Sequence, residues 1–108
     1  MDTNTANALY EAIKGSTLDE LARELFRAAI QYARYRTDWA LASLDERKEM
    51  DAARSRAHDT FIDSCNILSR NMGKIGEDNR WRALLGDDRK VIGDFACHLH
   101  CLLGLQAR

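Results

Sequence analysis

Apolar residues recur at alternating intervals of three and four along most of the chain, which is the pattern of helices with one buried face. The most regular series comprises Leu18, Leu21, Leu25, Ala28, Tyr32, Tyr35 and Trp39. A second long series comprises Met50, Ala53, Ala57, Phe61, Cys65, Leu68 and Met72. Shorter series occupy 9–13 and 92–103, and no segment alternates apolar and polar residues as a strand would. The pattern therefore predicts helices throughout.

Two four-residue segments have the form of a capping box, in which a hydroxyl and a carboxylate each accept a hydrogen bond from a free backbone amide. They are Thr17-Leu18-Asp19-Glu20 and Ser43-Leu44-Asp45-Glu46. They predict one long helix that ends near Ala42 and another that begins at Leu44. Joined by a tight turn, the two helices form an antiparallel hairpin. A single uninterrupted helix is the alternative, because neither proline nor glycine separates them.

Glycines mark most of the other predicted helix ends. Five of the six fall at boundaries, and these are Gly15, Gly73, Gly76, Gly86 and Gly104. The segment 78–85 reads as a short turn carrying Trp81, and Asp87 or Asp88 is expected to cap a last helix that ends at Gly104. Only Gly93 lies inside a predicted helix, where it costs up to about 1 kcal/mol relative to alanine. We expect close helix packing to be the reason for it.

These elements predict a single all-α domain over residues 1–108. It is a four- to five-helix bundle with two long antiparallel helices, a short turn region and a C-terminal helix. The composition agrees, because 45% of the residues are hydrophobic, 31% are charged and none is proline.

Charge and cysteine content narrow the class of protein further. Sixteen basic and seventeen acidic residues leave a formal charge of −1, which argues against a dedicated nucleic-acid or anionic-membrane binder. The three cysteines, Cys65, Cys97 and Cys101, have no disulfide-scaffold spacing. No secretory signal is visible in the first residues, and no apolar run has membrane-spanning length. We therefore expect a reduced, cytoplasmic protein with no membrane association.

Several short segments in the second half of the chain carry a resemblance to known proteins. They are Phe61-Ile62-Asp63, Asn66-Ile67-Leu68-Ser69-Arg70, Trp81-Arg82, Leu85-Gly86-Asp87-Asp88-Arg89-Lys90 and Ile92-Gly93-Asp94-Phe95-Ala96-Cys97. Through them, residues 58–108 resemble a family of short uncharacterised bacterial proteins, chiefly from Gram-positive and gut species. The resemblance implies a bacterial cytosolic protein. It assigns no activity, so no catalytic residue follows from it.

A candidate polar cluster lies between the third and last predicted helices. It contains His58 and Asp63 from the third helix and Arg89 and Asp94 from the last. Buried polar groups of this kind must be paired, so we expect a network that either fixes helix register or forms a ligand site.

Metal binding is a less favoured alternative. Asp94, His98 and Cys101 are spaced four and three apart on one helix face, but no established metal-binding signature is present. Free cysteines are more often small core residues. We therefore expect no cofactor.

Nucleic-acid binding is the third possibility. Arg80, Trp81 and Arg82 combine basic side chains with an aromatic ring that could stack on a base. Nearby aspartates would repel phosphate, so the favoured interpretation is a tryptophan that closes the end of the bundle, with arginines paired to these aspartates.

The second predicted helix is apolar over more than half its circumference, which exceeds the stripe that a packed helix needs. The surplus covers either the short first helix or a second copy of the chain, and we predict a homodimer.

No catalytic constellation or phosphate-cradling loop is visible. The sequence thus favours a non-enzymatic protein–protein interaction or regulatory module. The alternatives are a ligand- or metal-binding protein, possibly an enzyme, that uses the polar cluster, and a nucleic-acid-associated protein.

Overall fold

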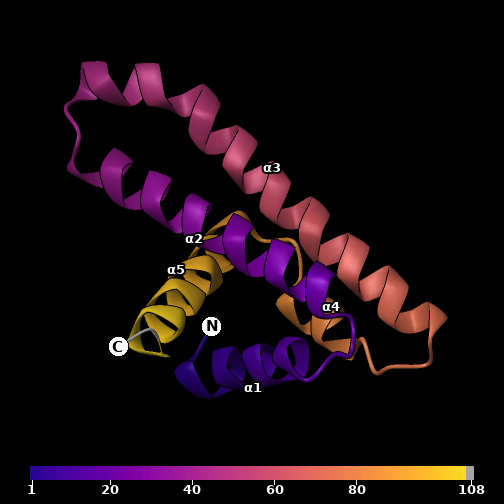
Figure 1. Ribbon diagram of the computed structural model, residues 1–108. Helices are drawn as coiled ribbons and strands as arrows, with labels where there is room; N and C mark the ends of the chain where they lie inside the picture. The colour runs from indigo at the N-terminus through magenta and orange to yellow at the C-terminus, as the bar shows by residue number, and fades with distance from the viewer. Residues whose placement is uncertain (107–108) are drawn as a thin grey trace.

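The computed structural model describes residues 1–106, with side chains as far as residue 104, and within these bounds it contains helices and no strand (Figure 1). The helices are α1 (Thr3–Lys14), α2 (Asp19–Leu41), α3 (Leu44–Lys74), α4 (Arg80–Leu85) and α5 (Arg89–Gln106). The predicted all-α fold is confirmed. Residues 107 and 108, which the predicted domain includes, lie outside the described part of the chain.

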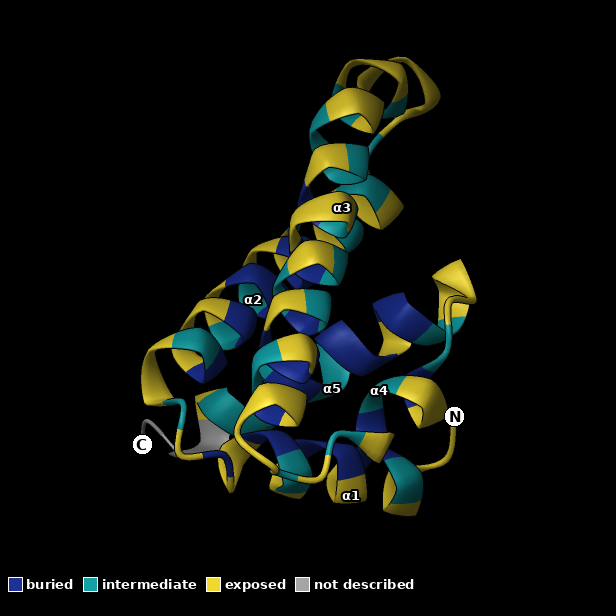
Figure 2. Cartoon of the chain, turned by 90° about the vertical axis from the view of Figure 1, so that its right-hand side faces the viewer, coloured by how far each residue is buried: buried dark blue, intermediate teal, exposed yellow. Residues whose placement is uncertain are grey.

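Helices α2 and α3 form the predicted antiparallel hairpin, and the capping box at Ser43 is present. The Ser43 side chain accepts a hydrogen bond from the Glu46 amide at 3.3 Å, and the Glu46 carboxylate accepts one from the Ser43 amide at 3.1 Å. The two helices pack along each other, but the tip of the hairpin extends beyond the other helices (Figure 2). This projection makes the molecule elongated, with extents of 47 × 28 × 24 Å.

The core lies where α1, α3 and α5 surround the part of α2 away from the hairpin tip, over residues 22–33. An aromatic series crosses it, because the Tyr32 ring lies 6.4 Å from that of Phe61, which lies 6.3 Å from that of Phe95. On the α1 side, Phe26 contacts Tyr10 at a ring separation of 5.8 Å. Part of the wide apolar face of α2 is therefore covered within one chain, by α1 at Phe26 and by α3 at Tyr32. The homodimer stays a prediction.

Gly93 is closely approached, but by the end of a side chain and not by the backbone of another helix as predicted. The guanidinium of Arg36, from α2, lies against the α5 backbone there, and a Cβ on Gly93 would come within 2.6 Å of the Arg36 Cζ. The same guanidinium donates a hydrogen bond of 3.3 Å to Asp94. Glycine in the middle of α5 thus makes room for a charged side chain that joins α5 to α2.

Two predicted helix ends are wrong. Thr17 does not cap α2, because its hydroxyl donates instead to Glu77 and the N-cap position is Leu18, which has no side-chain cap bond. Helix α5 continues through Gly104 to Gln106. Leu102 and Leu103 pack partly against the core just before that glycine, and such packing outweighs the roughly 1 kcal/mol helix penalty of glycine.

Glycine is required at the two ends of the α3–α4–α5 connection. Gly76 has φ +78° and Gly86 has φ +70°, a region that side chains with a Cβ rarely adopt. Of the two candidate caps for α5, Asp88 is the one used, since its carboxylate accepts a hydrogen bond of 3.0 Å from the Val91 amide. These two glycines fix the path of the chain around α4, and this path positions the candidate site.

Candidate functional site

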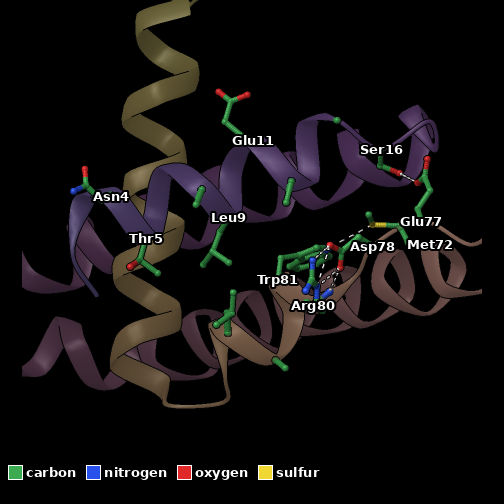
Figure 3. A pocket seen from close by; sticks show the side chains of 15 residues that line it. Asn4, Thr5, Leu9, Glu11, Ser16, Met72, Glu77, Asp78, Arg80 and Trp81 are labelled. Atoms are coloured by element: carbon green, nitrogen blue, oxygen red, sulfur yellow. Dashed lines mark hydrogen bonds and ion pairs between the residues drawn. The ribbon is translucent and has the colours of Figure 1, made fainter.

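A hollow of about 1110 Å³ runs along α1 and is bounded on its other side by α4 and the segment before it. We call it the α1–α4 groove. Figure 3 shows Leu9 and Trp81 between the two helices, with Ser16 and Glu77 together at one end. On the α1 side, Ala8, Ala12 and the C-cap residue Gly15 line it at intervals of four and three, so small groups form a row along this wall, flanked by Asn4, Thr5, Leu9 and Glu11.

The far wall owes its shape to the shortness of α4. Trp81 and Leu85, four residues apart, are both buried, and the Trp81 indole N–H donates to the Met72 sulfur at 3.3 Å. With only six residues, α4 has little other surface, and Leu84 is left 69% exposed beside the groove. Leu84 continues the apolar lining of the hollow, and contiguous apolar surface of this kind marks contact sites.

One end of the groove is closed by a hydrogen-bonded clamp that joins two loops. The Glu77 carboxylate accepts hydrogen bonds from the Ser16 hydroxyl at 2.7 Å, the Thr17 hydroxyl at 2.8 Å and the Thr17 amide at 3.0 Å. These bonds hold the pKa of Glu77 below its ordinary value, so the carboxylate is ionised at neutral pH. The clamp fixes the C-terminal end of α1 against the segment that leads into α4.

The charged residues that line the groove are mostly acidic. They are Glu11, Glu77, Asp78 and Arg80, and their formal charge is −2. The Arg80 guanidinium donates to Asp78 at 2.6 Å, and this pairing lowers the pKa of Asp78 to about 2. The one basic side chain of the lining is therefore neutralised by a neighbour, and Glu11 and Glu77 supply the surplus charge.

A second exposed apolar surface lies at the tip of the α2–α3 hairpin, where Leu41 is 83% and Leu44 is 75% exposed. Behind them, the Trp39 ring lies between the guanidinium groups of Arg47 and Arg54, at 4.4 and 4.3 Å from the ring centroid. Neither leucine lines the α1–α4 groove.

The four residues of the predicted polar cluster have separate surroundings. Arg89 donates to the Ser55 hydroxyl at 3.2 Å, Asp94 accepts from Arg36, and Asp63 is exposed. His58 contacts Asp59 at 3.1 Å and the edge of Tyr32. Among the residues that the structure describes, no hydrogen bond or ion pair joins any two of the four, so the expected network between them is not formed there.

The three candidate metal ligands also have separate surroundings. Asp94 is paired with Arg36, the His98 Nε2 lies 2.7 Å from the Asn7 side-chain oxygen, and Cys101 is an exposed free thiol. Within the described residues, no group of three or more histidine, cysteine, aspartate or glutamate side chains is placed to hold a metal ion.

The three nucleic-acid candidates serve the structure of the α4 segment. Trp81 is 3% exposed, so its ring faces cannot receive a base. Arg80 is paired with Asp78, and Arg82 donates to Asn66 at 2.7 Å, to the Gly86 carbonyl at 2.8 Å and to Asp87 at 2.7 Å. Trp81 is thus buried, and both arginines are paired with nearby aspartates, as the favoured interpretation expects.

The chain matches no family model, no curated protein and no solved structure. The resemblance of residues 58–108 to a bacterial family stays a prediction. None of the helices within the described residues is both long and apolar enough to cross a bilayer. The case for a function therefore depends on the geometry of the groove.

Proposed function

We propose that the protein is a non-enzymatic interaction module that binds a short helix of a partner protein in the α1–α4 groove. The observation that carries the proposal is the groove itself, an elongated hollow with small residues along one wall and a largely exposed leucine on the other. Helix-in-groove binding is a common form of peptide recognition, in which the apolar face of an amphipathic helix is buried.

The dimensions of the groove support a helical occupant. Helix α1 has 12 residues and is therefore about 18 Å long, which corresponds to about three turns of a partner helix. Ala8, Ala12 and Gly15 allow another helix backbone to come close to α1, since small residues at a contact reduce the interaxial distance. Leu84 then contacts the partner from the opposite wall.

The remaining parts of the proposal concern location and assembly. Three free cysteines, with Cys101 exposed, support a reducing cytoplasmic location. The proposal assigns the groove to a different protein. Binding of a second copy is an alternative outcome of the test.

The test is a selection of helical peptides displayed on phage, carried out against the wild type and against Leu84→Glu. We expect enriched peptides with apolar residues at helical intervals, and we expect Leu84→Glu to weaken their binding at least about tenfold, because it places a charge in an apolar contact. Leu84 is mostly exposed, so the substitution should change the free energy of unfolding by no more than about 0.5 kcal/mol.

The matched control is Leu44→Glu, the same chemical change at an exposed leucine outside the groove. It should leave peptide binding unchanged. The proposal fails if no peptide is enriched, or if both variants bind the enriched peptides equally. It also fails if sedimentation shows a dimer that Leu84→Glu alone dissociates, because a second copy would then occupy the groove.

A further inference from the structure

We infer that the partner helix is basic, with lysine or arginine side chains flanking its apolar face. This inference rests on the proposed function and specifies the chemistry of the ligand. It follows from the distribution of charge around the groove, because the chain as a whole has a formal charge of only −1 whereas the groove lining has −2.

The acidic surplus is not neutralised by basic neighbours on α1. Lys14, which follows Glu11 by three residues, lies over the Tyr10 ring at 5.6 Å from its centroid and does not line the groove. Glu11 is exposed at the edge of the groove, and Figure 3 shows its side chain pointing away from Trp81. A partner side chain that reached it would form an ion pair at the edge of an apolar contact, where screening by water is reduced.

The end of the groove at Ser16 adds a second negative charge. The Glu77 carboxylate is held there by neutral donors, two hydroxyl groups and an amide, so its charge is stabilised but not cancelled. This charge favours a cation and disfavours an anionic ligand such as a phosphate or a fatty acid.

Charge should therefore decide which apolar helices bind. A partly desolvated ion pair contributes about threefold to fivefold in affinity, and a like-charge contact costs a similar amount. With two surplus carboxylates, a basic helix should bind at least about tenfold more tightly than an acidic helix with the same apolar face.

The experiment uses two synthetic peptides that share the apolar positions enriched in the display selection. One has lysine at every flanking position and the other has glutamate, and both are titrated by fluorescence anisotropy at 50 and 300 mM salt. We expect the lysine peptide to bind at least about tenfold more tightly at 50 mM salt, with a smaller difference at 300 mM, because salt screens partly exposed charges.

Glu11→Lys should reduce the advantage of the lysine peptide at least about threefold. Glu49→Lys is the matched control. It makes the same charge change in α3, 23 residues before the groove residue Met72 and thus about 35 Å from it along the helix, well beyond the screening distance. Equal affinity of the two peptides would overturn the inference and leave the proposed function standing. If neither peptide bound, the proposed function itself would fall.

Discussion

Replacing His58 by leucine should stabilise the protein, although the change removes a hydrogen bond. The His58 Nε2 is buried without a hydrogen-bond partner among the described residues, and its side chain is only 14% exposed. A buried polar atom that loses its water without gaining a partner costs about 1–3 kcal/mol. Leucine fills a similar volume against Tyr32 and carries no such cost.

The hydrogen bond that is lost is a weak one. The His58 Nδ1 lies 3.1 Å from an Asp59 carboxylate that is 74% exposed, and such a surface contact contributes about 0.5–1 kcal/mol. The net expectation for His58→Leu is a gain of about 1 kcal/mol in the free energy of unfolding. For a domain of about this size, that gain raises Tm by about 4–8 °C.

The assay is urea unfolding followed by far-UV circular dichroism at pH 8, together with a thermal scan. His100→Leu, at a partly exposed position in α5, is the control for the general effect of the substitution, and it should lie within about 0.5 kcal/mol of the wild type. A loss of 1 kcal/mol or more in His58→Leu, with His100→Leu unchanged, would refute the reasoning. It would mean that Nε2 has a partner in solution, and the polar-cluster hypothesis would regain support.

Three further predictions concern other parts of the chain. Burial raises the pKa of the Cys65 thiol to about 12, so a disulfide reagent at pH 8 should modify Cys97 and Cys101 in the native protein and Cys65 only after unfolding. Because hydrogen bonds lower the pKa of Glu77 from 4.5, their contribution to stability is present at neutral pH and lost as the pH falls. Glu77→Gln should therefore be less stable than the wild type at pH 7, and the difference between their urea midpoints should shrink as the pH is lowered below 4.5. Arg82→Lys should destabilise by about 2 kcal/mol in the same assay, because one ammonium cannot reach all three acceptors of the guanidinium, and destabilisation below 0.5 kcal/mol would contradict its structural role.

The helices were predictable where the signals that define them are local. The separation of α2 and α3 follows from Ser43 and Glu46, which are three residues apart and meet whenever a helix starts there. Thr17 has the same local motif, but its hydroxyl donates to Glu77, 60 residues away. A motif states what a hydroxyl can do locally, and it cannot exclude a distant partner that competes for the same group.

The polar cluster illustrates a second limit. Helical spacing correctly placed Asp94 on α5 but could not identify the helix that faces it. That helix is α2. Its Arg36 guanidinium lies against Gly93 and donates a hydrogen bond to the Asp94 carboxylate. Glycine at position 93 was the signal that a large group approaches α5 there, although nothing in the sequence identified the group.

The α1–α4 groove could not be predicted, because its shape depends on how α4 is placed. Ala8 and Ala12 are ordinary residues of a short amphipathic helix, and Leu84 is one of two adjacent leucines of which only Leu85 is buried. Which leucine faces the core depends on the path that Gly76 and Gly86 allow. Only the assembled fold shows that these residues share one surface.

The most direct test of the docking claim is an amide chemical-shift titration of the isotopically labelled protein with a peptide from the display selection. The proposed mode predicts shift changes along 4–16 in α1 and its following loop and along 77–84, with none at the hairpin tip over 41–46. Shift changes centred on the tip, or on the outer face of α3, would show that the α1–α4 groove is not the docking surface.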